Sequence, residues 1–225
     1  MGLGSYAAGA AIDAAAKHEE MKRALQGRTP DQQKVIKYFF GAGGCLNKGL
    51  TDEEYDAMLR AKLNSMDIRA KALNKIGLDE SQVNEIEPVH FEGYLFDDKK
   101  AYALMGKDRL WRSSAYQVTW LFFSDSQVYV YQYTFHMDED GKKESTEEYF
   151  YKDITNFSTS SESVEKEVVD KVSCTGKTTY SRRSVDTDRF ALVVPGDKFL
   201  CSMEKTEYTE RAIQGMKAKL REKKS

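Results

Sequence analysis

The feature that most constrains this chain of 225 residues is a run of alternating apolar and polar positions in its middle. Between residues 116 and 122 nearly every second residue is aromatic or β-branched, and the same period of two returns in the segment VYVYQYTFHM at 128–137. The polar break Ser124-Asp125-Ser126 separates the two segments. A period of two in β-branched and aromatic residues is typical of β-strands. The sequence therefore predicts a β-hairpin here.

Further strands are expected after this hairpin, in the segments EEYFYKDITNFS, RFALVV and KFLCSM. A serine-rich and charged stretch at 158–189 separates the first of these segments from the second. The chain then continues into a helix at about 206–223, in which Ile213, Met216 and Leu220 share one face. Several antiparallel strands followed by one amphipathic helix predict a small β-barrel or sandwich capped by that helix.

Residues 1–87 are predicted to be helical, which makes the fold class α+β. Thr29 with Gln32, and Thr51 with Glu54, have the spacing of capping boxes, and each pair predicts the start of a helix. The segment GAGGCLNKG between them is expected to be a flexible joint. Helices are expected at about 5–26, 29–40, 51–63 and 65–76, and the β domain is expected at 88–225.

Composition limits the classes of function. The 34 basic and 36 acidic residues give a net charge of −2, so the chain lacks the basic excess that general nucleic-acid binding requires. The three cysteines are far apart in the sequence and indicate reduced cytosolic thiols rather than a disulfide framework: Cys45, Cys174 and Cys201. The sequence shows neither a signal-peptide pattern nor an apolar run of membrane-spanning length. We therefore expect a cytoplasmic protein.

The β-rich part resembles bacterial pleckstrin-homology-like (PH-like) domains. The likeness rests on the aromatic hairpin from Tyr116 to Phe135, on Tyr151, Asp153 and Ile154, which match a Tyr-x-Asp-Ile strand of the family, and on the terminal AIQGMKAKL helix. It covers about residues 88–225. The resemblance implies a non-catalytic binding or scaffold module with a protein or peptide partner.

A second resemblance covers residues 48–63, KGLTDEEYDAMLRAKL, which are similar to the short helical SHOCT-type module. This chain has Glu54-Tyr55 where that family has a glutamate-phenylalanine pair. The resemblance implies that the helical region accompanies another domain. A further hypothesis follows from the amphipathic helices of residues 29–76, which could drive self-association because short helices cannot bury their apolar faces alone.

A basic loop is one candidate binding site. It is the run Lys99-Lys100 followed by Lys107, Arg109 and Arg112. Lys107-x-Arg109 in this run resembles the pattern with which phosphoinositide-binding members of the pleckstrin family hold phosphates, and arginine binds such oxygens bidentately. This pattern predicts a peripheral membrane module as an alternative function. Asp97, Asp98 and Asp108 dilute the positive charge nearby, so the other interpretation is an ordinary solvated loop.

A second candidate is the row of tyrosines on one face of the second hairpin strand: Tyr129, Tyr131 and Tyr133. If Val128 and Val130 point inward, this tyrosine strip is exposed and predicts a partner-binding surface. If the tyrosines point inward, they belong to the core. Sequence alone leaves both open.

No pattern indicates catalysis, a cofactor or a metal. Residues 136–147 match some positions of a calcium loop, but His136 stands at the first ligand position, which favours a polar turn. Gly176-Lys177-Thr178 lacks the first glycine of a phosphate-binding loop. Ser181-Arg182-Arg183-Ser184 is a small basic segment that is expected to be an exposed loop. We therefore predict a protein that is not an enzyme and has no cofactor.

Overall fold

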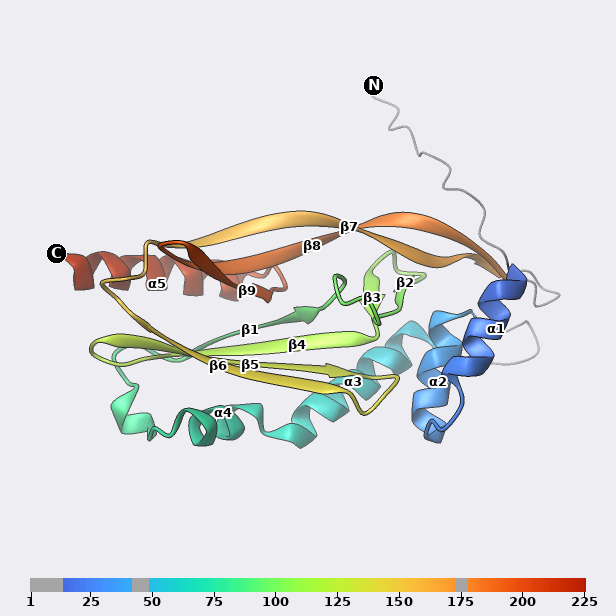
Figure 1. The fold of residues 1–225 in the computed structure, drawn as a ribbon, viewed down its shortest axis with the longest axis horizontal. Helices are drawn as coiled ribbons and strands as arrows, with labels where there is room; N and C mark the ends of the chain where they lie inside the picture. The colour runs from blue at the N-terminus through green and yellow to red at the C-terminus, as the bar shows by residue number, and fades with distance from the viewer. Residues whose placement is uncertain (1–13, 42–48, 173–177) are drawn as a thin grey trace, which may run out of the picture.

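The computed structural model describes residues 14–41, 49–172 and 178–225, which form an α+β fold (Figure 1). In these segments, helices come first, strands follow and one long helix comes last. The helices are α1 (Ala14–Ala24), α2 (Pro30–Phe39), α3 (Asp52–Met66), α4 (Ile68–Ile76), the 3-10 turn η1 (Glu80–Gln82) and α5 (Glu207–Lys224).

Both predicted capping boxes are confirmed. The Thr29 hydroxyl accepts a hydrogen bond from the Gln32 backbone, and the Gln32 side chain accepts one from the Thr29 backbone, at the start of α2. Thr51 and Glu54 make the same reciprocal pair at the start of α3. Each pair satisfies backbone N–H groups that a helix start otherwise leaves without partners.

The strands form three antiparallel groups. A four-stranded sheet has the order β1-β4-β5-β6, a three-stranded sheet has the order β7-β8-β9, and β2 pairs with β3. The strands are β1 (Val89–Tyr94), β2 (Ala103–Met105), β3 (Trp111–Ser113), β4 (Ala115–Phe123), β5 (Gln127–His136), β6 (Lys142–Phe150), β7 (Asn156–Val172), β8 (Thr178–Val194) and β9 (Asp197–Ser202). The predicted aromatic hairpin is confirmed as β4 and β5, with Trp120 opposite Tyr131.

Three layers result. Figure 1 shows the four-stranded sheet in the middle, α3 and α4 below it, and the three-stranded sheet with α5 above it. Below the sheet, one apolar cluster joins Tyr55, Leu59 and Ile68 of the helices to Phe122 and Tyr131. Above the sheet, a second cluster joins Phe91, Leu121 and Val130 to the other sheet and α5. Both faces of the aromatic hairpin are therefore buried.

The tyrosine strip is not a free binding surface. Tyr131 is completely buried, Tyr133 is 5% exposed and Tyr129 is half-buried, because the N-terminal helices pack on this face. The interpretation that places the tyrosines in the core is the correct one. Val128 and Val130 on the opposite face are buried as well, because the other sheet packs on them.

The charged stretch at 158–189 does not merely connect two strands, as was expected from the sequence. It forms most of β7 and β8, two strands of 17 residues, and Ser181-Arg182-Arg183-Ser184 lies within β8 rather than in a loop. Its two strands are polar but complementary, since Arg182 lies opposite Glu167 and Arg183 forms an ion pair with Asp170. Cross-strand partners of this kind support a strand that its own composition does not predict.

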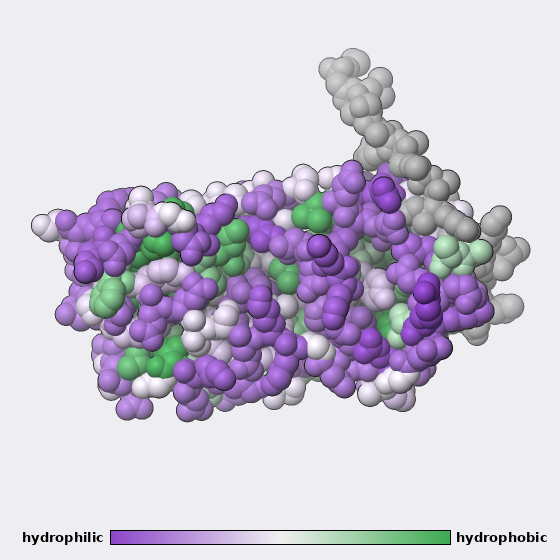
Figure 2. Space-filling view, viewed as in Figure 1, coloured by the Kyte–Doolittle hydropathy of each residue, from purple (hydrophilic) through white to green (hydrophobic). Residues whose placement is uncertain are grey.

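The two larger sheets form a sandwich rather than a barrel, since no strand pairing joins them within the described residues. The face drawn in Figure 2 is mostly hydrophilic, with apolar residues in small separate patches. The segment 41–49 and the alanine-rich start of the chain fall largely outside the described residues, as do Cys45 and Cys174.

Candidate ligand-binding cleft between the sheets

The interior of the sandwich changes from apolar to polar along β5. On the face toward the second sheet, Val128 and Val130 are followed by Gln132, Thr134 and His136. Thr134 and His136 are 6% exposed. A sandwich interior is normally apolar, and buried polar groups are normally hydrogen-bonded. The polar half therefore needs hydrogen-bond partners, which the neighbouring strands supply in part.

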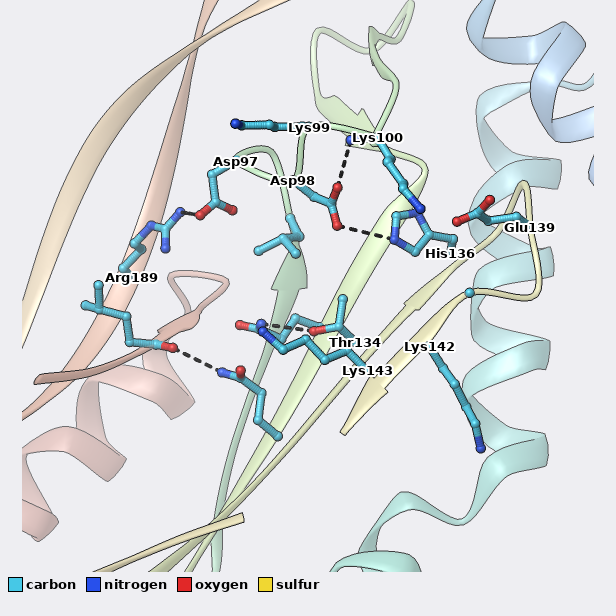
Figure 3. A pocket seen from close by; sticks show the side chains of 15 residues that line it. Asp97, Asp98, Lys99, Lys100, Thr134, His136, Glu139, Lys142, Lys143 and Arg189 are labelled. Atoms are coloured by element: carbon cyan, nitrogen blue, oxygen red, sulfur yellow. Dashed lines mark hydrogen bonds and ion pairs between the residues drawn. The ribbon is translucent and has the colours of Figure 1, made fainter. Parts of the chain in front are cut away.

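A cleft of about 600 Å³ opens between the sheets at this polar end. We call it the intersheet cleft. Its floor comes from β4 and β5, its opposite wall from β8 and β9, and its rim from the loop after β1 and the start of β6 (Figure 3). The residues that line it are Leu95, Asp97, Asp98, Lys99, Lys100, Gln117, Gln132, Thr134, His136, Glu139, Gly141, Lys142, Lys143, Arg189 and Leu200.

Two glutamines fix the floor. The Gln117 side chain accepts a hydrogen bond from the Ser202 backbone N–H at 2.7 Å and donates one to the Thr134 hydroxyl at 3.1 Å. The Gln132 amide donates to the Leu200 carbonyl at 3.0 Å. These bonds tie the outer edge of β9 to the four-stranded sheet. The two sheets are thus held at a fixed separation beside the cleft.

Two buried groups in the cleft have polar atoms without a hydrogen-bond partner among the described residues: Arg189 Nε and His136 Nδ1. The Arg189 side chain is 8% exposed and pairs through Nη2 with Asp97 at 2.6 Å, while its Nε lies 3.5 Å from Glu162. An unsatisfied buried donor is energetically costly. The Arg189 N–H is thus suited to donate to a ligand acceptor, while His136 Nδ1 donates or accepts according to the tautomer of the ring.

His136 lies between two carboxylates. Its Nε2 is 3.3 Å from Asp98 Oδ2, and its Nδ1 is 3.9 Å from Asp138 Oδ1. Asp138 is 5% exposed, and burial raises the pKa of its carboxyl above the usual value. The Lys62 ammonium of α3 donates to the His136 carbonyl at 2.7 Å, which fixes the end of β5.

Lysines give the cleft its positive character. Lys99, Lys100 and Lys143 have no ion-pair partner among the described residues. The three acidic side chains of the lining are already engaged: Asp97 by Arg189, Asp98 by His136, and Glu139 by Arg28 at 3.1 Å.

Lys142 and Lys143 differ in direction, because adjacent residues of a strand point to opposite faces. Lys143 lies opposite Thr134 on the cleft side, whereas Lys142 lies opposite Phe135 on the helix side. Figure 3 shows Lys143 reaching across the floor and Lys142 pointing away.

The predicted basic loop is divided by the structure. Lys107 and Arg109 are exposed at the turn between β2 and β3, and Arg109 has a positive φ of 66°. Arg112 is buried: its guanidinium bonds both oxygens of Asp56 and both oxygens of Asp108, and it donates to the Leu110 carbonyl. All five N–H donors of the guanidinium are used. Arg112 is therefore a structural clamp rather than a free phosphate ligand.

Lys99 and Lys100 belong to the basic run predicted from the sequence, whereas Lys143 and the polar floor of the intersheet cleft were not among the candidates. A signal for them is present, since the inward positions of β5 change from valine to glutamine, threonine and histidine at Gln132. The opposite wall carried no such signal, because Arg189 and Leu200 lie far along the chain.

The described part of the chain shows no reactive cysteine and no cluster of metal ligands. Cys201 is fully buried, and burial raises the pKa of its thiol to about 12, so it is not a thiolate at neutral pH. Across the described segments, no three His, Cys, Asp or Glu side chains cluster in a way that could hold a metal ion. None of the described helices is long and apolar enough to span a bilayer.

In comparisons with known proteins, no family model, no curated protein and no solved structure matches this chain.

Proposed function

We propose that this protein is a non-catalytic binding module of PH-like type, acting in the cytoplasm, whose intersheet cleft binds an acidic segment of a partner protein. The order of a four-stranded antiparallel sheet, a three-stranded one and a C-terminal helix supports the PH-like assignment. Tyr151, Asp153 and Ile154 do not support it, because they lie in the turn between β6 and β7 and not in a strand. Fold alone is a weak argument for function. The proposal therefore rests on the cleft.

The observation that carries the proposal is the combination of free cations and buried unsatisfied donors. Lys99, Lys100 and Lys143 line the cleft, and Arg189 on its β8 wall has an Nε that makes no hydrogen bond to a described residue and lies 3.5 Å from Glu162. Cations and N–H donors around one concave site favour anionic ligands, because such charge-assisted hydrogen bonds are the stronger ones.

Carboxylates of a peptide fit this arrangement better than a single phosphate. A tight phosphate site uses a bidentate arginine, and the terminal nitrogen of Arg189 is already paired with Asp97. The cations come from separate elements, with Lys99 and Lys100 on the loop after β1 and Lys143 on β6. Several carboxylates spaced along a chain can reach separate lysines of this kind.

The test is a titration of the full chain into labelled oligo-glutamate and oligo-lysine peptides, followed by fluorescence anisotropy. We expect binding of the acidic peptide only, and weaker binding at high salt because exposed charges are screened. Absence of acidic-peptide binding at low salt would overturn the proposal.

A lysine away from the cleft provides a matched control. Lys143→Glu reverses a charge in the cleft, whereas Lys224→Glu makes the same change at the exposed end of α5, which does not line the cleft. We expect Lys143→Glu to weaken acidic-peptide binding about tenfold, which corresponds to about 1.4 kcal/mol, and Lys224→Glu to change it little. Equal effects of the two would show that only the net charge of the protein matters.

A second function is favoured by the end of the β2–β3 hairpin. Here Met105 is 45% exposed and Leu110 is 62% exposed, beside the exposed cations Lys107 and Arg109. Exposed apolar side chains next to lysine and arginine are suited to the surface of an anionic membrane. This hairpin therefore supports peripheral membrane attachment as the alternative function.

Co-sedimentation with anionic and neutral vesicles tests the alternative. Attachment through the hairpin predicts binding to anionic vesicles that is lost in Lys107→Glu/Arg109→Glu and weakened in Leu110→Ser. Lys143→Glu is the control, because it changes the cleft and leaves the hairpin intact. Equal sedimentation with neutral vesicles would contradict an electrostatic attachment.

A further inference from the structure

The edges of the two larger sheets differ in how they are covered. At β1, the Glu92 carbonyl accepts a hydrogen bond from the Glu204 backbone, and at β9 the two glutamines of the cleft bond the backbone. β7 packs against β2 and α5. The remaining edge is β6, whose pairing partner in the described structure is β5. An uncovered edge strand offers free backbone N–H and C=O groups to another strand.

β6 is long enough to pair. It spans nine residues, Lys142–Phe150, most of them exposed, and lies at the margin of the sheet (Figure 1). In an antiparallel ladder, the backbone groups of alternate residues point away from the existing neighbour. The outer side of β6 therefore presents a regular series of donors and acceptors.

The charge pattern of β6 is complementary to itself in the antiparallel direction. Lys142 and Lys143 begin the strand, and Glu147 and Glu148 lie near its end. A second copy of β6, paired antiparallel about Ser145, places Lys142 opposite Glu148 and Lys143 opposite Glu147. Opposite charges directly across a strand pair are stabilising, and like charges are destabilising.

The same pattern selects the register. A shift by two residues places Glu144 opposite Glu148 and opposes two carboxylates. A shift by one residue places the cleft face of one copy beside the helix-covered face of the other. The register centred on Ser145 is therefore the one that keeps both faces aligned and pairs every lysine with a glutamate.

We propose that two copies of this chain associate through antiparallel pairing of their β6 edges, which joins the two four-stranded sheets into one continuous sheet. This twofold contact uses the same patch on both copies. The contacts that β6 charges make within one chain compete weakly, since Glu144 lies 3.6 Å from Lys75 and 3.7 Å from Lys142 on an exposed surface. Lys142 and Lys143 line the cleft as well, whereas Glu147 and Glu148 do not, so the Glu147→Lys/Glu148→Lys variant tests this contact separately from the cleft.

Charge reversal tests this contact. The full chain, a Lys142→Glu/Lys143→Glu variant and a Glu147→Lys/Glu148→Lys variant are compared by light scattering with size-exclusion chromatography. We expect a dimeric parent and two monomeric variants, because each variant opposes like charges across the pair. An equimolar mixture of the two variants is expected to form the dimer again, since their strands carry opposite charge.

The control is Arg221→Glu/Lys224→Glu, which makes the same charge change as the first variant on the exposed end of α5 and is expected to stay dimeric. Unchanged melting temperatures would show that the variants fold. A monomeric parent over a wide range of protein concentration would overturn the proposal. Two variants that remain dimeric, or a mixture that remains monomeric, would overturn it as well.

Discussion

Arg112 makes a bidentate ion pair between the strands and the helical region. It lies on β3 and bonds both oxygens of Asp56 on α3 at 2.8 Å each. Tyr94 of β1 donates to the same Asp56 at 3.0 Å, and Tyr55 of α3 donates to the Ser113 carbonyl at 2.6 Å. These bonds hold α3 against the β domain. We predict that Arg112→Leu loosens this attachment and destabilises the whole chain.

The expected loss in the free energy of unfolding follows from the burial of Arg112 and of its two carboxylate partners. The Arg112 side chain is 4% exposed, while Asp56 and Asp108 are 31% and 39% exposed. Removing one partner of a fully buried ion pair costs about 3–5 kcal/mol, because the other charge is left without compensation. Water can reach both carboxylates here, so we expect about 3 kcal/mol. For a chain of this size, this loss lowers the melting temperature by about 6–12 °C.

Urea unfolding and thermal melting of the parent, Arg112→Leu and Lys107→Leu measure the effect. Lys107 is exposed in the same hairpin, so its substitution should change the free energy of unfolding by less than about 0.5 kcal/mol. Arg112→Lys keeps the charge but not the bidentate geometry and should lie between the two. An Arg112→Leu protein as stable as the parent would refute the clamp.

Three further predictions follow from buried groups. Tyr131→Ala should cost about 3–5 kcal/mol in urea unfolding because the ring is fully buried, whereas Tyr131→Phe should cost less than about 1 kcal/mol because the hydroxyl has no hydrogen-bond partner. Arg112 lowers the pKa of Asp56 and lowers that of Asp108 to about 2, so the two ionised carboxylates stabilise the folded protein. This stabilisation is present above about pH 4 and is lost as the pH falls toward 2. Urea unfolding should show a smaller loss of stability over this pH range in Arg112→Leu. In a variant that keeps Cys201 as its single cysteine, a thiol reagent should label the folded protein far more slowly than the unfolded one.

Local patterns predicted the elements whose signals lie within a few residues. The capping boxes at Thr29 and Thr51 marked the starts of α2 and α3, and the alternation around Trp120 and Tyr131 marked β4 and β5. These features depend on neighbours in sequence, so the chain itself contains the needed information.

Features that depend on distant partners were not predictable in this way. β7 and β8 have polar residues on both faces, and their pairing rests on complementary partners such as Glu167 and Arg182. Arg112 has the sequence context of a phosphate ligand, but its guanidinium is occupied by Asp56, which lies 56 residues earlier in the chain. The tyrosine strip could have been exposed or buried, and the helices that cover it decided the question.

The most direct test of the proposed function is to map where an acidic peptide contacts the chain. Backbone amide chemical shifts of the full chain are followed by nuclear magnetic resonance during titration with oligo-glutamate. Binding in the intersheet cleft predicts that the shifts concentrate at Gln117, Thr134, His136 and Lys143, and that the Lys143→Glu variant needs about tenfold more peptide to reach the same shifts. Shifts confined to the β2–β3 hairpin, or spread evenly over exposed lysines, would contradict the cleft as the binding site.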